Sequence, residues 1–70
     1  MRWVDLLRTI RRAAINSGID FTLKRQGKAH ELWLCGQIPL VIPRHRRLNR
    51  MTVESICKQL KSELGKDWWK

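Results

Sequence analysis

Two short glycine-containing turns, Gln26-Gly27-Lys28 and Gly36-Gln37, separate three segments that have the composition of β-strands. Connections of two or three residues join antiparallel neighbours, because a parallel crossover needs a dozen or more residues. Glycine adopts positive φ at little steric cost, so we expect Gly27 to provide it in the first turn. The sequence therefore predicts a three-stranded antiparallel sheet, with strands at residues 20–25, 29–35 and 38–42.

The three strand segments differ in how their apolar side chains are distributed. The first alternates, with Phe21 and Leu23 on one side and polar residues on the other, which is typical of a half-buried strand. The second carries apolar residues on both faces, as a central strand does, so the pattern leaves open which way His30 points. The third is bracketed by Pro39 and Pro43, which cannot donate to a ladder, so it is predicted to lie at an edge.

Helical periodicity flanks the strand segments on both sides. Residues 3–16 and 51–64 each gather apolar side chains on one face, at steps of three and four residues. Asn49 or Thr52 is expected to cap the start of the second helix. Because both helices need an apolar surface to cover, the predicted fold is a two-layer α+β domain. Its order is helix–strand–strand–strand–helix, with both helices on one face of the sheet.

The chain is strongly basic. Its 70 residues include 15 Lys or Arg against 6 Asp or Glu, which gives a net charge of +9. Such an excess on one small domain, spanning residues 1–70, attracts polyanions and leaves nucleic acid, an acidic protein and an anionic membrane as candidate partners. Arg8, Arg11 and Arg12 share one face of the first helix, where they either contact phosphates or are simply solvated.

The apolar runs, the cysteines and the tryptophans of the tail further limit the kinds of protein that this chain can be. No apolar run approaches the roughly 20 residues of a membrane span, and Asp5 stands where a signal peptide would be apolar, so we expect a cytoplasmic protein. Cys35 and Cys57 lack the spacing of a metal site or a disulfide framework and are expected to be buried small hydrophobic residues. The tail at residues 66–70 contains two adjacent tryptophans, which are expected to pack on the core or to contact a partner.

His30 is the candidate catalytic residue. Histidine is the side chain whose ordinary pKa allows it to accept and donate protons near neutral pH. Here it lies at the start of the second strand, between two groups of basic residues. The residues expected to contact RNA are Lys24, Arg25, Lys28, Arg44, His45, Arg46 and Arg47. A histidine among cations that hold a phosphate backbone is typical of a ribonuclease, and a His30 that merely hydrogen-bonds is the alternative.

The order of the elements and three short motifs resemble the HicA-type toxins, the small mRNA interferases of bacterial toxin–antitoxin pairs. The motifs are the turn that leads to His30, the segment at residues 41–45, and the segment at residues 52–56. The resemblance extends from about Leu6 to Leu64. In that family a Gly-Ser-His turn opens the second strand, whereas this chain has Lys28-Ala29 before the histidine. The resemblance implies an α-β-β-β-α fold like that of double-stranded-RNA-binding domains (dsRBD-like).

The resemblance also implies an activity and a partner. His30 would be the single catalytic residue of a metal-independent endoribonuclease, the toxin of a type II pair that acts in stress responses without a cofactor. A HicB-like antitoxin protein would cover the active site. The chain is therefore expected to be a monomer when free and a hetero-oligomer with its antitoxin, and to have no membrane contact.

Cleavage of RNA by one histidine needs no metal. The imidazole removes the proton of a ribose 2′-hydroxyl, whose oxygen attacks the adjacent phosphorus. Lys28 and the loop that contains Arg44 and Arg46 are expected to stabilise the phosphorane, and His45 is the fallback acid for the leaving oxygen. Two alternatives stay open. They are a non-catalytic RNA- or DNA-binding module of the same fold and a protein-interaction domain that docks an acidic partner.

Overall fold

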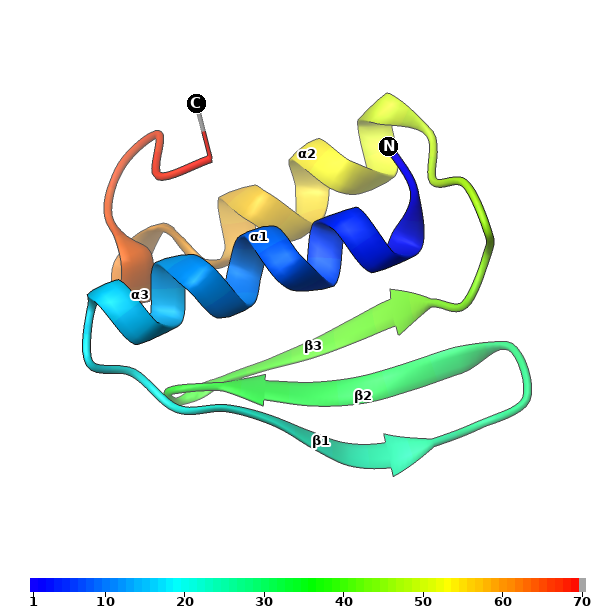
Figure 1. Ribbon diagram of the computed structural model, residues 1–70, viewed down its shortest axis with the longest axis horizontal. Helices are drawn as coiled ribbons and strands as arrows, with labels where there is room; N and C mark the ends of the chain where they lie inside the picture. The colour runs from blue at the N-terminus through cyan, green and yellow to red at the C-terminus, as the bar shows by residue number, and fades with distance from the viewer. Residues whose placement is uncertain (70) are drawn as a thin grey trace.

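The computed structural model describes residues 1–69 and contains the predicted order of elements (Figure 1). These are α1 (Trp3–Asn16), β1 (Phe21–Gln26), β2 (His30–Cys35), β3 (Ile38–Pro43), α2 (Arg50–Gln59) and α3 (Lys61–Leu64). The first helix and the three strands begin and end within one residue of their predicted bounds.

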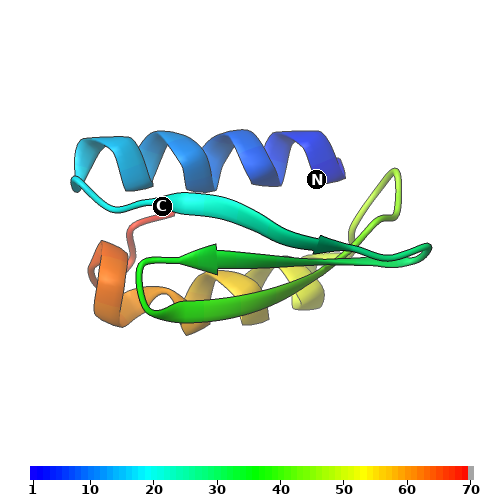
Figure 2. The same cartoon turned by 90° about the horizontal axis from the view of Figure 1, so that it is seen from below.

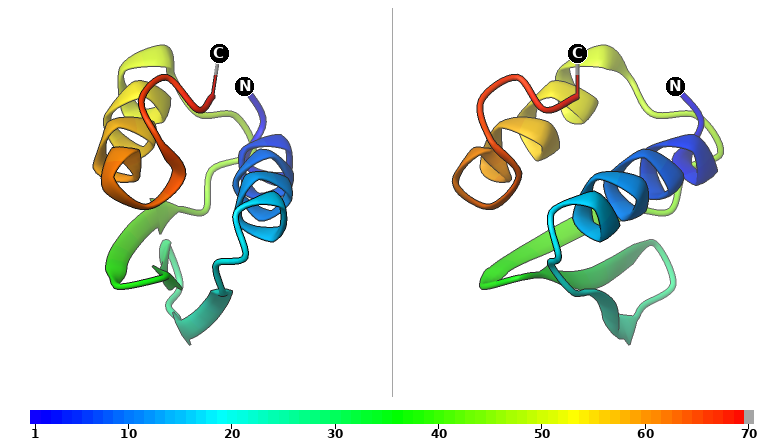
Figure 3. Two further views of the ribbon diagram at one scale, coloured as in Figure 1. Left: turned by 90° about the vertical axis from the view of Figure 1, so that its left-hand side faces the viewer. Right: turned by 60° about the vertical axis from the view of Figure 1, so that its left-hand side comes forward.

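The strands form one antiparallel sheet in the order β1-β2-β3, so β2 is central and β3 is an edge strand, as predicted. The two long helices, α1 and α2, lie on the same face of this sheet, as Figure 1 shows, with α1 toward β1 and α2 toward β3 (Figure 2). Over residues 1–69, the opposite face has no element packed on it (Figure 3). The predicted two-layer α+β fold is confirmed, with the short α3 added after α2.

The core lies between the helices and the sheet. Its fully or nearly fully buried hydrophobic residues are Leu6, Ile10, Ala14, Trp33, Cys35, Leu40, Ile42, Leu48, Ile56, Cys57 and Leu60. In α1 and α2 these residues recur at helical spacing, and in β2 and β3 they occupy alternate positions. The periodicity of each element therefore identifies the face that it buries.

The first turn is built differently from the prediction, which assigned positive φ to Gly27. The structure gives Gly27 no positive φ. Instead, a Cβ at this position would lie 2.9 Å from the backbone oxygen of His30, which also accepts the Gly27 N–H at 2.9 Å. Glycine is needed here because the turn brings two backbones into contact. The second turn does require a left-handed residue, since Gly36 has a φ of 58°.

The outer edge of β3 offers few hydrogen-bond donors. The N–H of Arg44 donates to the Ala29 carbonyl at 2.8 Å, and hydrogen-bonded pairs alternate along an antiparallel ladder. Pro39, Val41 and Pro43 therefore direct their backbone groups away from β2. Because proline has no N–H, Val41 carries the one outward N–H of the six residues of β3.

The second helix is shorter than predicted, and the expectation of a single helix over 51–64 is wrong. α2 ends before Leu60, where the backbone leaves the α-helical path, and α3 follows as a separate turn. Periodicity does not reveal this break, because Leu60 and Leu64 pack inward in either arrangement. The start is as predicted, since the side-chain oxygen of Asn49 accepts the Thr52 N–H at 2.8 Å.

The C-terminal segment folds back toward the helices (Figure 1). The indole N–H of Trp68 donates to the Cys57 carbonyl at 2.9 Å, and Trp69 meets Trp68 edge-on with ring centres 5.9 Å apart. Both rings are half-buried against the core. The expectation that this pair packs on the core is confirmed, and Lys70, the last residue of the predicted tail, lies outside the described residues.

Both cysteines are free thiols inside the core, as predicted. Burial raises the pKa of the Cys35 thiol, and it raises the pKa of Cys57 to about 11. Because the thiolate is the reactive form, we expect neither thiol to react with an aromatic disulfide reagent at about pH 8 in the folded protein. Both should react at once in concentrated guanidinium. One fast equivalent in the absence of denaturant would contradict the burial of these thiols.

Candidate nucleic-acid interface around His30

Backbone hydrogen bonds bring three separate segments to one end of the sheet. The loop between β3 and α2 joins the β1–β2 hairpin through the Arg44 N–H and the Ala29 carbonyl. The N-terminus joins the same loop, because the Trp3 N–H donates to the Arg46 carbonyl at 3.2 Å. In Figure 1 this end of the molecule lies on the right. The two groups of basic residues, which are 16 or more positions apart in the sequence, therefore approach each other here.

His30 is the first residue of β2 and is exposed to solvent. Its neighbour Glu31 is buried with the core-facing residues of the strand, at 4% exposure. Since successive side chains of a strand point to opposite faces, His30 lies on the uncovered face of the sheet, across from Pro43 of β3. The structure thus decides the orientation of His30, which the sequence pattern left open.

A β-bulge in β1 changes the face on which Arg25 lies. The register shifts at Lys24, so that Arg25 pairs with Leu32 and does not continue the alternation that begins with Leu23. Without the shift, Arg25 would share the helix-side face with Leu23. With it, Arg25 lies on the uncovered face, diagonally across from His30 and within reach of a long side chain. Arg25 is therefore a cation on the same face as the candidate catalytic residue.

The Arg44 side chain is directed to the other face of the sheet. Its Nε lies 3.8 Å from a carboxylate oxygen of Glu31, and its guanidinium carbon lies 5.4 Å from the centre of the Trp3 ring. Arg44 thereby ties the β3–α2 loop to the sheet and to the start of α1. The backbone of Arg44 meets the hairpin that bears His30, but its guanidinium faces away from the imidazole. A contact of Arg44 with RNA stays a prediction.

The remaining residues predicted to contact RNA are all exposed. They are Lys24 in the bulge, Lys28 in the β1–β2 turn, and His45, Arg46 and Arg47 in the β3–α2 loop. The backbone of Arg47 also bridges to Arg2, which adds a further basic residue to this end of the molecule. The exposed cations thus surround the tip of the sheet on which His30 lies.

Glu31 supports this region from the core, and the sequence analysis did not single it out. Its Oε1 accepts the indole N–H of Trp33 at 3.1 Å, and Trp33 stacks on Phe21 with ring centres 4.4 Å apart. The Arg11 guanidinium lies over both rings, 5.8 and 6.0 Å from their centres. The signal in the sequence is the alternation of Glu31 with Trp33 and Cys35, which places the carboxylate on the buried face. The network holds the start of β2 in place beneath His30.

The face that bears His30 also exposes apolar side chains. Leu32 and Leu34 follow His30 at alternate positions, and Val41 pairs with Leu32 from β3 and is 61% exposed. Such a surface suits contact with bases, and the charges of Arg25 and Lys28 are complementary to phosphates. Because it is open, it suits a polymer better than an enclosed small molecule.

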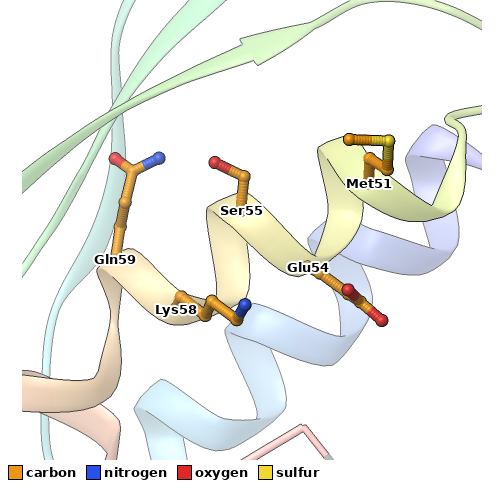
Figure 4. A pocket seen from close by; sticks show the side chains of 5 residues that line it. All are labelled: Met51, Glu54, Ser55, Lys58 and Gln59. Carbon is orange, nitrogen blue, oxygen red and sulfur yellow. The ribbon is translucent and has the colours of Figure 1, made fainter.

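A surface hollow away from His30 does not combine groups for catalysis. One of about 480 Å³ lies along α2, where Met51, Ser55 and Gln59 extend on one side and Glu54 and Lys58 on the other (Figure 4). Its lining includes no histidine that could activate the Ser55 hydroxyl. Within residues 1–69, no three His, Cys, Asp or Glu side chains are grouped so that they could hold a metal ion. The helices described are too short or too polar to cross a membrane.

No protein-family model, no curated protein and no solved structure matched this chain in the comparisons made. The features of this end of the sheet that bear on function are an exposed histidine, a cation on its face, and a rim of basic residues.

Proposed function

We propose that this chain is a metal-independent endoribonuclease, the toxin of a type II toxin–antitoxin pair, and that it cleaves mRNA in the cytoplasm. The observation that carries the proposal is the exposed position of His30 at the start of β2. The β-bulge in β1 places Arg25 on the same face of the sheet. The resemblance of the sequence to HicA-type toxins, in which the corresponding histidine is catalytic, supports the same assignment.

In the proposed reaction the His30 imidazole accepts the proton of a ribose 2′-hydroxyl. A bond forms between the 2′ oxygen and phosphorus, the bond from phosphorus to the 5′ oxygen breaks, and that oxygen takes up a proton. Negative charge develops on the phosphorane oxygens, where fixed cations lower the barrier. Arg25 and Lys28 are the cations on or beside the face of His30, so we assign the stabilisation of the phosphorane to them. Arg44, which the sequence suggested for this role, is directed to the other face.

The test is cleavage of a single-stranded RNA by the purified chain in excess EDTA. The proposal expects products with 2′,3′-cyclic phosphate and 5′-hydroxyl ends, and no cleavage at a nucleotide whose 2′-hydroxyl is replaced by hydrogen. A matched substrate with the deoxy substitution away from the cleavage position is the control. Products with 5′-phosphate ends, or cleavage that EDTA abolishes, would refute the mechanism.

Arg25 and Lys24 form a matched pair of neighbouring cations. Because the bulge places Arg25 on the face of His30, Arg25→Ala is expected to lower the single-turnover cleavage rate by about tenfold or more. Lys24→Ala removes the same charge from the extra residue of the bulge, and a change below about threefold is expected, as for one screened surface charge. Equal rates for the two variants would show that the register shift has no catalytic consequence.

A second candidate function is a non-catalytic RNA-binding module. The observation that favours it is that, among residues 1–69, no side-chain hydrogen bond reaches the His30 imidazole, whereas a catalytic histidine is commonly oriented by a neighbour. RNA binding without cleavage by the wild-type chain would select this candidate.

Under the toxin proposal, a HicB-like antitoxin covers His30 in a hetero-oligomer and the free chain is a monomer.

A further inference from the structure

The outward face of α1 carries a second group of cations, away from His30. Arg8, Arg11 and Arg12 line a shallow hollow of about 260 Å³ together with Ile15 and Asn16. Arg11 is held over the Phe21 and Trp33 rings at the β1 side of the helix, where Figure 2 shows α1 running beside β1. Arg8 and Arg12 lie one helical turn apart, a rise of about 6 Å along the axis.

The folded-back tail places aromatic rings at the other side of the same helix face. Trp68 and Trp69 line a hollow of about 200 Å³ with Thr9, Arg12, Ala13 and Asn16. Arg12 and Asn16 belong to both hollows, so the arginine group and the tryptophan pair are continuous across α1. The hydrogen bond from Trp68 to the Cys57 carbonyl fixes the ring that supports Trp69.

A cationic track bordered by aromatic rings is the arrangement that binds single-stranded nucleic acid, because phosphates contact the cations and bases stack on the rings. We infer that the face formed by Arg8, Arg12 and Trp69 is a second binding subsite for single-stranded RNA. Phosphates lie against Arg8 and Arg12, and a base packs against Trp69. The inference rests on the proposed function, since it concerns the RNA that the His30 end would cleave.

The acidic group close to this face does not cancel its charge. Asp5 pairs with Arg2 at 3.0 Å and lies 3.9 Å from Arg8, so it shares its charge between these two arginines. The Arg2 guanidinium and the hydrogen bond that it donates lower the pKa of the Asp5 carboxyl, which is therefore ionised at neutral pH. Arg11 and Arg12 add two positive charges on the same face. Arg8, Arg11 and Arg12 together outweigh the Asp5 carboxylate on the same helix, so this face of α1 stays cationic, which matches a polyanion.

The experiment measures RNA binding in the His30→Ala chain, so that cleavage does not interfere. The probes are an oligouridylate of about ten nucleotides, within the usual site sizes for single strands, and inorganic polyphosphate, which has charges but no bases. Trp69→Leu keeps an apolar side chain against the core and removes the stacking ring. Arg12→Gln removes one exposed charge, and Arg50→Ala at the start of α2 is the control for net charge.

Trp69→Leu is expected to weaken oligouridylate binding about fivefold or more and to leave polyphosphate binding unchanged. Arg12→Gln should weaken both and reduce the slope of log affinity against log salt by about 0.7. Trp69→Phe should bind like the parent. If Trp69→Leu proves unfolded by circular dichroism, the Arg12→Gln salt slope against that of Arg50→Ala decides the question.

Unchanged oligouridylate affinity and salt slope in the folded variants would overturn the subsite. That result leaves the ribonuclease proposal intact, because cleavage by the chain with His30 present is measured separately. Conversely, a chain that never cleaves but shows these binding changes would retain the subsite and refute the catalytic proposal.

Discussion

Replacing His30 with alanine is expected to reduce the rate of RNA cleavage by about 100-fold or more. General base catalysis by one positioned side chain contributes a factor of about 10² to 10⁴, and no other described group on the uncovered face can accept a proton near neutral pH. RNA affinity should change little, because the variant retains the cations that are proposed to bind RNA, which are Arg25, Lys28 and those of the exposed loop. Single-turnover cleavage with a labelled RNA, beside a filter-binding measurement, separates the two effects.

His45→Ala is the matched control for this variant. His45 is also an exposed histidine at the same end of the sheet, but it lies in the β3–α2 loop and not on β2. If His30 is the base, His45→Ala should retain most of the cleavage, and a moderate loss would identify His45 as the acid for the leaving 5′ oxygen. Full activity in His30→Ala would refute the proposed mechanism outright.

The second large effect is expected in stability, from Trp33→Ala. Trp33 is 6% exposed, stacks on Phe21 and donates its indole N–H to Glu31. Its removal leaves a cavity and an under-satisfied buried carboxylate, and substitutions of this kind cost about 3–5 kcal/mol. A domain of this size has a total free energy of unfolding of only about 4–10 kcal/mol. Trp33→Ala should therefore be largely unfolded on moderate warming, as urea and thermal denaturation would show.

Two further variants distinguish the causes of that loss. Trp33→Phe keeps an aromatic ring to stack on Phe21 and removes the N–H that Glu31 accepts together with part of the ring volume, so its cost should be about 1–3 kcal/mol. Ile15→Ala alters a side chain of α1 that is 71% exposed, and its effect should stay within about 0.5 kcal/mol. A cost for Trp33→Ala similar to that of Ile15→Ala would contradict the assignment of Trp33 to the core.

Local patterns were sufficient to predict the elements and their layers. Glycine turns delimited the strands, helical spacing identified the inner faces of α1 and α2, and Asn49 marked the start of α2. The break at Leu60 was missed, because a short helix that continues after a turn keeps the same inward residues. Periodicity reports which side chains are buried and does not report whether the backbone between them is continuous.

The candidate site was only partly predictable, for a related reason. The position of His30 at a strand start follows from the sequence, but its face depends on the burial of Glu31, a charged residue that propensity would place outside. The side of the sheet on which Arg25 lies depends on one extra residue in β1, and no local sequence pattern predicts that bulge. The contacts of the Arg44 side chain with Glu31 and Trp3 join segments that are distant along the chain. These orientations and contacts are properties of the assembled sheet and cannot be read from any one segment of the sequence.

The prolines of β3 limit how another protein can recognise this chain. Strand addition depends on a row of free main-chain donors and acceptors, and the outer edge of β3 keeps the Val41 N–H as its one donor. A partner that extends the sheet at this edge would form an incomplete ladder, and copies of the chain are discouraged from polymerising edge to edge in the same way. At the β3 edge, recognition therefore depends on side chains, and an inhibitor that engages the open face beside β3 would contact His30 directly.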